Sequence, residues 1–175
     1  LRGLELMPSE GISPDVIALT RCLEACKTVG VINTGQQLHI EVIEKGYETD
    51  HYIGNTLVGM YGKFGFYDEA NMMFDKLLVQ DRASWNALIS GYAEQGLIKE
   101  ALDCLEQMRC EGMHPDLGTF VCSLQASCGI HAIGITQELH AEIVKEGLEG
   151  VSCVNSALVN VYVKVGLLAA AQDVF

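Results

Sequence analysis

The feature that most constrains the fold of this chain is an internal repeat, because the sequence matches itself without a gap when it is shifted by 101 residues. The matching positions are apolar, aromatic, glycine and charged, and they extend over the whole overlap. Examples are Leu23 with Leu124, His39 with His140, Tyr61 with Tyr162, and Gly65 with Gly166. Self-similarity at a fixed spacing is typical of repeat proteins, in which each unit buries its apolar face against the next. We therefore expect an array of stacked units rather than a domain with one central core.

The long period divides into three shorter units, of 35, 31 and 35 residues. The predicted units are a long-type repeat at 15–49, a short-type repeat at 50–80, an ordinary-type repeat at 81–115, a second long-type repeat at 116–150, and a truncated short-type repeat at 151–175. Residues 1–14 match the tail of a preceding ordinary-type repeat. Both ends of the chain would then cut through a repeat, so we expect the chain to be a piece of a longer protein.

Each unit is predicted to form two antiparallel helices, as the ordinary-type unit illustrates. Its apolar residues recur at helical spacing in two stripes. The first stripe is Trp85, Leu88, Ile89 and Tyr92, and the second is Ala101, Leu105 and Met108. Gly96 is the expected turn between them, Gly112 and Pro115 are expected to end the second helix, and Asp116 is suited to cap the next one. Because a helix pair cannot bury its stripes alone, the pattern predicts an all-α fold, an α-solenoid of stacked helix-turn-helix units.

Composition excludes several other classes of protein. The chain is 49% hydrophobic, so it can bury a core. Its net charge of -12 argues against simple electrostatic attraction to nucleic acid or to an anionic membrane. No apolar stretch reaches the ~18 residues of a membrane span, so we expect no membrane partner. The seven cysteines form no CxxC pair, and we expect reduced thiols packed as small apolar groups.

Two short patterns raise the question of catalysis or metal binding. An H-x-E sequence begins at His39 and again at His140, but the P-C-x-x-C half of the zinc deaminase signature is missing, and duplication favours a packing role. Cys22 and Cys26 with His39 would make an incomplete zinc ligand set, so packing is again favoured. No P-loop, dinucleotide-binding glycine motif or nucleophile–base pattern is present. We expect this segment to be no enzyme and to use no metal, cofactor or small-molecule substrate.

The residues themselves indicate which kind of helical repeat is present. Ser84 to Asp116, SWNALISGYAEQGLIKEALDCLEQMRCEGMHPD, closely resembles a pentatricopeptide repeat (PPR). GNTLVGMYGKFGFYDEANMMFDKL resembles the short variant of that repeat, and both GQQLHIEVIEKGYETD and TQELHAEIVKEGLEG resemble the end of the long variant. The alternation of long, short and ordinary units resembles the PLS subclass of plant pentatricopeptide proteins. The resemblance covers the whole chain.

The resemblance implies a right-handed superhelix that binds single-stranded organellar RNA, about one base per repeat. In the family, the fifth residue of the first helix and the last residue of the repeat read the base. The corresponding pairs here are Asn55 with Asp81, Asn86 with Asp116, and Thr20 with Asp50, while Ser156 holds the fifth place of the last unit. An Asn amide carries both donors and an acceptor, so it can meet the Watson–Crick edge of a base. In the family, an Asn/Asp pair favours uracil over cytosine and a Thr/Asp pair favours guanine.

Two further features of the family apply to these units. The second residues of the repeats sandwich each base, and here these are Ile17, Tyr52, Ala83, Gly118 and Cys153. Ala83 and Gly118 are small and are therefore expected to be weaker platforms. The second long-type unit would use Val121 and Val151, neither of which can hydrogen-bond to a base, so that unit should discriminate little.

Other interpretations stay open on the sequence alone. Asn55 and Asn86 could be ordinary polar residues near helix ends. The whole array could be a protein-binding scaffold like a tetratricopeptide array, although the W-x2-L-G-x2-Y pattern of that repeat is absent. The resemblance favours the addressing part of an organellar RNA editing, processing or stabilising factor in the mitochondrion or chloroplast. Its partners would be organellar RNA and proteins of an editing complex, and a deaminase-like domain could follow Phe175.

Overall fold

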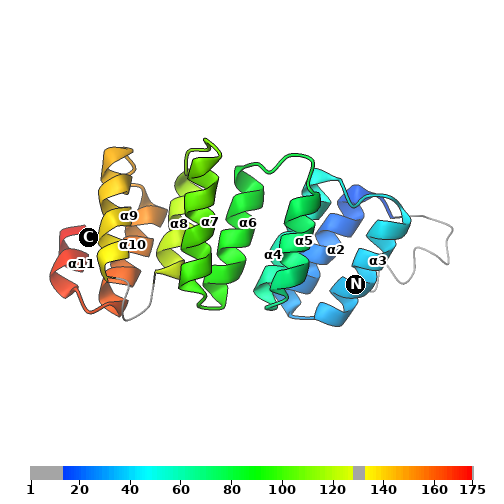
Figure 1. Ribbon diagram of the computed structural model, residues 1–175. Helices are drawn as coiled ribbons and strands as arrows, with labels where there is room; N and C mark the ends of the chain where they lie inside the picture. Colours follow the sequence, from blue (N-terminus) through cyan, green and yellow to red (C-terminus); the bar gives the residue numbers. More distant parts are fainter. Residues whose placement is uncertain (1–13, 128–132, 175) are drawn as a thin grey trace. The chain divides into compact units, whose positions relative to one another are not determined.

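The computed structural model describes residues 14–127 and 133–174, and every regular element in them is an α-helix (Figure 1). The all-α prediction is thus confirmed for this part of the chain. The helices are α2 (Val16–Val29), α3 (Ile32–Glu44), α4 (His51–Lys63), α5 (Tyr67–Lys76), α6 (Arg82–Glu94), α7 (Ile98–Cys110), α8 (Leu117–Ala126), α9 (Ile133–Lys145), α10 (Ser152–Lys164) and α11 (Leu168–Val174). The predicted tail of a preceding repeat, residues 1–14, lies outside the described residues except for Pro14.

The helices alternate between two roles along the chain. Each of the five predicted units with described helices contains one pair, and we call its members the first helices (α2, α4, α6, α8 and α10) and the second helices (α3, α5, α7, α9 and α11). Short turns join the two helices of most pairs. As the sequence predicts, Gly96 makes the turn between α6 and α7, and Gly112 follows the end of α7. Gly96 and Gly112 adopt positive φ angles of 73° and 79°, which a residue with a Cβ adopts only at a cost.

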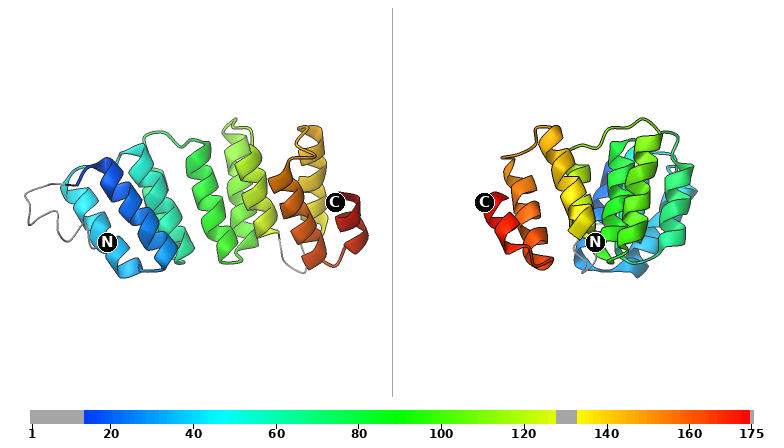
Figure 2. Two further views of the ribbon diagram at one scale, coloured as in Figure 1. Left: turned by 180° about the vertical axis from the view of Figure 1, so that it is seen from behind. Right: turned by 60° about the vertical axis from the view of Figure 1, so that its left-hand side comes forward.

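The chain forms two compact units, Leu1–Ala87 and Leu88–Phe175. In the first, α2 packs against α3 and against α4, the first helix of the next pair, while α4 also packs against α5 (Figure 2). In the second, α8 packs against α7, α9 and α10, and α10 also packs against α9 and α11. Neighbouring first helices therefore contact each other directly within each compact unit. This is the stacking of helix pairs that the repeat predicts.

Buried apolar stripes hold the pairs together. The predicted stripes of the ordinary-type unit are buried, with Trp85 exposed by only 1% and Met108 fully buried. Within the first compact unit, Trp85 at the start of α6 packs edge-on against Phe74 of α5, with ring centroids 4.6 Å apart. Such aromatic contacts add to the free energy that area burial alone provides, by about 1 kcal/mol. One repeat is therefore fixed on the next by a large, well-oriented core contact.

Small residues set how closely the first helices approach. A Cβ atom built on Gly59 of α4 would lie 3.0 Å from Nζ of Lys27 on α2. A Cβ atom on Gly54 would collide with the side chain of Leu77. Glycine at position 59 therefore leaves room for the side chain of Lys27 against α4.

Candidate functional site

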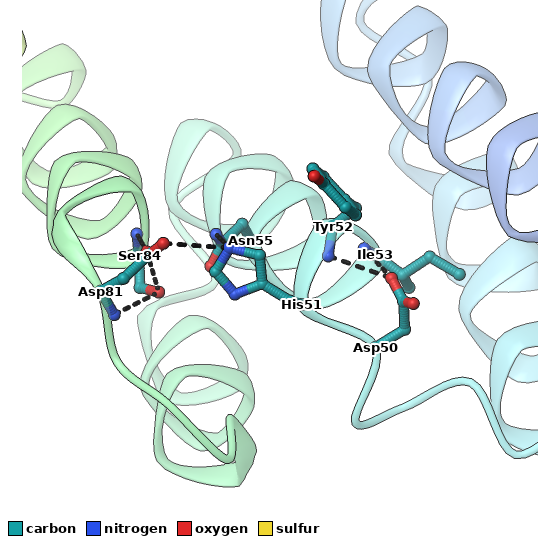
Figure 3. Close-up of polar contacts among 7 residues, drawn as sticks. All are labelled: Asp50, His51, Tyr52, Ile53, Asn55, Asp81 and Ser84. Carbon is teal, nitrogen blue, oxygen red and sulfur yellow. Dashed lines mark hydrogen bonds and ion pairs between the residues drawn. The ribbon is translucent and has the colours of Figure 1, made fainter.

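Aspartates at the start of first helices place carboxylates at the predicted unit boundaries. Asp50 caps α4, because its Oδ1 accepts hydrogen bonds from the backbone N–H groups of Tyr52 at 3.0 Å and Ile53 at 3.1 Å (Figure 3). Asp15 caps α2 in the same way, with Oδ1 2.8 Å from the N–H of Ala18. Such side-chain caps satisfy donors that the first turn of a helix leaves free. The cap holds each carboxylate in one orientation.

At the two boundaries of the ordinary-type unit, the capping aspartates also exchange hydrogen bonds with a hydroxyl side chain. Oδ1 of Asp81 accepts from both the N–H and the hydroxyl of Ser84, at 2.9 and 3.0 Å. The Asp81 N–H in turn donates to the Ser84 hydroxyl. Asp116 forms the equivalent capping box with Thr119 at the start of α8. In each of these caps the helix engages Oδ1, so Oδ2 of Asp81 is the oxygen available for another partner.

That second oxygen of Asp81 meets a histidine that the sequence did not single out. Nε2 of His51 lies 3.0 Å from Oδ2 of Asp81 and 3.5 Å from Nδ2 of Asn55. Figure 3 shows the imidazole between the other two side chains, while Tyr52 points away from Asp81. The structure therefore brings the predicted pair Asn55 and Asp81 to one place, with His51 connecting them. The spacing of His51 and Asn55, four residues apart on one helix, was the signal that could have revealed this contact.

The electrostatics of this cluster favour a charged Asp81. Burial by itself would raise the pKa of Asp81, but hydrogen bonds from Ser84, the neighbouring His51 and the N–H of Ala83 outweigh it. The pKa of Asp81 consequently lies below its usual value. By contrast, Oδ1 of Asn55 is buried and has no hydrogen-bond partner in the part of the chain that the structure describes. An unsatisfied amide oxygen beside a fixed carboxylate is a place where a polar ligand gains binding energy.

The first long-type unit places three predicted residues around one cleft. Ile17, Thr20 and Tyr52 line a cleft of about 350 Å³ together with Val16, Arg21 and Glu24. The apolar side chains of Ile17 and Tyr52 are 66% and 71% exposed, which is unusual for large hydrophobic residues. The Thr20 hydroxyl donates to the carbonyl of Val16 at 2.7 Å and still has acceptor capacity. A cleft that combines exposed apolar side chains with the polar groups of Thr20, Arg21 and Glu24 fits the faces and the edge of a planar ring.

The remaining predicted residues are distributed over both compact units. Asn86 is half-buried on α6 and Ala83 is exposed near the start of the same helix. In the second compact unit, the exposed Ser156 donates to the carbonyl of Ser152 at 2.7 Å and lines a cleft of about 540 Å³. Val151 stands at the start of α10 without a side-chain cap. Gly118 and Cys153 are exposed, and Val121 is half-buried.

The duplicated H-x-E histidines make packing contacts. Nδ1 of His39 lies 2.7 Å from the hydroxyl of Tyr61, and Nδ1 of His140 lies 2.7 Å from the hydroxyl of Tyr162. Both pairs join a second helix to the first helix of the next repeat, with ring centroids 5.5 Å apart. Burial lowers the pKa of His39 and raises the pKa of both tyrosines. The identical geometry supports the packing interpretation of these histidines.

The cysteines and histidines give no sign of a metal centre. Within residues 14–127 and 133–174, no three His, Cys, Asp or Glu side chains gather closely enough to hold a metal ion. Cys26 is buried, and its pKa is raised by that burial and by the nearby Cys22. These same ranges contain no helix that combines the length and the apolar character needed to cross a bilayer.

Charge is divided between the two sets of helices. The described first helices carry five cationic residues, Arg21, Lys27, Lys63, Arg82 and Lys164, and two carboxylates, Glu24 and Glu94. The described second helices carry four cationic residues and eleven carboxylates. The net charge of -12 therefore arises mostly away from the first helices, although the aspartates that cap α2, α4, α6 and α8 add four carboxylates at their starts. The overall acidity of the chain consequently does not exclude an anionic ligand on the first helices.

Comparison with known proteins gives matches along the chain. Residues 55–81 match the model of the PPR repeat, and residues 80–129 match that of the PPR repeat family. The chain is 34% identical over 167 residues to the pentatricopeptide repeat-containing protein At4g38010 of Arabidopsis thaliana, covering 95% of this chain and 29% of that protein. It is 32% identical to the chloroplastic protein At4g25270 of the same plant, covering 97% and 32%. The chain thus spans about a third or less of the length of the curated relatives it matches.

A solved structure has the same fold. The crystal structure of the pentatricopeptide repeat protein PPR10 in complex with an 18-nt psaJ RNA element superposes with a TM-score of 0.85 at 22% identity. The match covers 98% of this chain and 26% of that one. A second crystal structure, of the pentatricopeptide repeat protein PPR10 from maize, superposes with a TM-score of 0.70 at 22% identity.

Proposed function

The chain is built from pentatricopeptide repeats, and we propose that it uses them to bind single-stranded RNA in a sequence-specific way, about one base per repeat. The observation that carries the proposal is that Asn55 and Asp81 both contact His51, on the helix that also carries the exposed Tyr52. An oriented amide and carboxylate next to an exposed aromatic ring supply hydrogen bonds for the edge of a base and a surface for its face. PPR10, which shares the fold, was crystallised with RNA.

The base preferences follow from the family pattern. Asn55 with Asp81 and Asn86 with Asp116 would each favour uracil over cytosine, and Thr20 with Asp50 would favour guanine. Since these three units are consecutive in the chain, the preferred RNA would contain a guanine next to two uracils. Ile17, Tyr52 and Ala83 would stack on the bases. Tyr52 is the aromatic residue among these three and its side chain is exposed, so it should be the strongest stacking platform.

The charge distribution supports contact through the first helices. Within these helices the cationic residues exceed the carboxylates by five to two. The four aspartates that cap them bring the carboxylates to six, which is still far less acidic than the second helices with four cationic residues and eleven carboxylates. Base edges rather than phosphates would then carry most of the specificity, so affinity should fall only shallowly with salt. The acidic second helices would repel the RNA backbone and so direct the RNA toward the first helices.

For the protein to which these repeats belong, we propose an organellar role in RNA editing, processing or stabilisation. Several relatives are named chloroplastic, which supports an organelle. The long, short and ordinary unit lengths support the PLS subclass, whose members act in such processes. In that setting the repeats address the RNA, and proteins of an editing complex or a further catalytic domain act on it.

The proposal is tested by selecting binders from a pool of single-stranded RNA with randomised sequence. The parent chain should enrich a motif with two adjacent uracil-preferring positions. Asn55→Val should erase base preference at one of them and Asn86→Val at its neighbour, because each removes one amide from one repeat. Thr56→Ala, on the solvent side of the same helix, should leave the motif unchanged. A parent chain that enriches no motif, or two variants that affect the same position, would contradict the proposal.

A protein-binding scaffold is the competing function, and the eleven carboxylates on the second helices are the observation that favours it. Such a surface would attract basic partners and lose them steeply with added salt. If the chain is such a scaffold, it should enrich no motif in the RNA selection. The RNA selection and a salt titration of binding therefore separate the two functions.

A further inference from the structure

A third side chain, His51, stands between the two predicted base-reading residues of the short-type unit. It is the first residue of α4, one helical turn before Asn55, so both side chains project from the same face. Its Nε2 lies 3.0 Å from Asp81 and 3.5 Å from Asn55 (Figure 3). Asp81 thus reaches Asn55 through the imidazole.

The cap on α6 fixes which oxygen of Asp81 the histidine meets. Oδ1 already accepts two hydrogen bonds from Ser84, while Oδ2 faces His51. A carboxylate held on one side by a helix N-terminus cannot turn to offer the other oxygen without losing the cap. His51 therefore engages the oxygen with which Asp81 would otherwise orient Asn55 or hold a water molecule.

The protonation of Nε2 then determines the orientation of the Asn55 amide. Facing a carboxylate, Nε2 is more stable carrying a proton that it donates to Oδ2 than presenting a lone pair. An N–H at this place repels the NH2 group of Asn55 and attracts its oxygen. When the amide turns by half a rotation, Oδ1 of Asn55 comes next to this N–H and gains a partner, while Nδ2 takes the buried place that Oδ1 has now.

The orientation of that amide matters because uracil and cytosine carry reversed donors and acceptors. Uracil presents an N3–H donor and an O4 acceptor, whereas cytosine presents an N3 acceptor and an N4 donor. An amide that can rotate satisfies either base, but an amide held in one orientation presents the same donor and acceptor arrangement to both bases. A side chain that fixes the amide consequently changes the ratio of the two affinities.

We propose that His51 is a specificity-determining residue of the short-type unit, which fixes the Asn55 amide and thereby sets the preference between uracil and cytosine. The proposal rests on the RNA binding proposed above. His51 acts through Asn55 and needs no contact with the base itself. It is therefore a positioning residue, and it adds a third residue to the pair that the family pattern assigns to this unit.

The test uses the full chain and the randomised RNA pool, with the nucleotide that faces the short-type unit identified by Asn55→Val. His51→Phe keeps a planar ring but removes both nitrogens, and it should change the uracil-to-cytosine ratio at that nucleotide by about three- to tenfold, the effect of one hydrogen bond. His51→Gln retains an N–H donor for Asp81 and should stay closer to the parent ratio. Thr56→Ala is the matched control on the same helix and should keep both the ratio and the affinity.

Three outcomes would overturn the proposal. One is that His51→Phe changes neither the uracil-to-cytosine ratio nor the affinity. Another is that it changes the affinity equally for both pyrimidines, which indicates a structural or competing role. In these two cases the parent chain still enriches its motif, so the proposed function stands. A parent chain that enriches no motif would instead overturn RNA recognition itself and this inference with it.

Discussion

The chain contains a long-type and a short-type repeat twice, once in helices α2–α5 and again in helices α8–α11, and the two copies agree where they pack. Leu57 and Leu158 are both buried, as are Val42 and Ile143. The histidine–tyrosine contact recurs at the same 2.7 Å distance. The helix pairs therefore use one packing solution in both places.

The copies differ at the positions that are proposed to contact RNA. The changes from the first copy to the second are Thr20 to Val121, Asp50 to Val151, His51 to Ser152, Tyr52 to Cys153, and Asn55 to Ser156. Packing depends on the adjoining helices, which are similar in both copies, whereas the proposed base contacts would depend on a target that changes along the RNA. This difference is what a sequence-reading array requires, and the following experiments test it.

The largest effect is expected from truncating equivalent buried side chains in the two copies. Leu57→Ala and Leu158→Ala should each lower the local free energy of unfolding by about 3 kcal/mol, because both remove a fully buried side chain and leave a cavity. Amide hydrogen exchange in α4 and α10 measures each loss separately, since repeat arrays need not unfold in one step. A much smaller loss in one copy would contradict equal packing.

The next largest effect is expected from transferring base contacts to the second copy. The double variant Val121→Thr and Val151→Asp gives its long-type unit the pair found in the first copy. It should acquire a guanine preference of about tenfold, or about 1.4 kcal/mol, in selection from randomised RNA. Val151→Asp alone is the control and should acquire none, because no hydroxyl would then face the base. An unchanged motif in the double variant would place the contact elsewhere.

Exchanging the helix caps should give a smaller, reciprocal effect. Asp50 caps α4 with two hydrogen bonds, whereas Val151 offers none to α10. Asp50→Val should lower the stability of α4 by about 1 kcal/mol, and Val151→Asp should raise that of α10 by a similar amount. Hydrogen exchange in the first turns of the two helices is the measurement. Asp50→Asn should retain most of the cap, and changes of the same sign in both copies would refute the comparison.

The smallest effect is expected from lowering the pH. Burial lowers the pKa of His39, so the folded first copy binds this proton less readily than the unfolded chain does. Its stability is complete above the ordinary histidine pKa of about 6.5 and declines as the pH falls from there toward the lower folded pKa. His39→Gln, which does not titrate, should weaken this decline in α3 and α4. Hydrogen exchange followed as a function of pH would reveal it, and an identical pH dependence in the variant would exclude His39 as its source.

Much of this architecture could be predicted from the sequence because it depends on local periodicity. The apolar stripe from Trp85 to Tyr92, the turn at Gly96 and the cap at Asp116 all arise from residues within a few positions of each other. The fold class follows from them, because helix pairs with one apolar stripe each can only stack. The base-reading roles of the predicted residues and the boundaries of the units remain predictions.

The interactions that the sequence did not reveal join residues far apart in the chain. His51 meets Asp81 across thirty residues along the sequence, and only the folded chain brings the first turn of α4 close to the residue that precedes α6. The unequal charge of the first and second helices, by contrast, could have been derived from the sequence, because it requires only the assignment of each charged residue to a helix. The net charge of the whole chain does not show this difference.

The helix caps described above also limit how such an array can evolve. A boundary residue such as Asp81 must both start a helix and present its second oxygen to the neighbouring repeat. Only short polar side chains such as Asp, Asn, Ser and Thr do the first task well. Few residue types therefore suit this position. A mutation to another type would weaken the start of the helix and, if the proposed base contact holds, change what the repeat recognises at the same time.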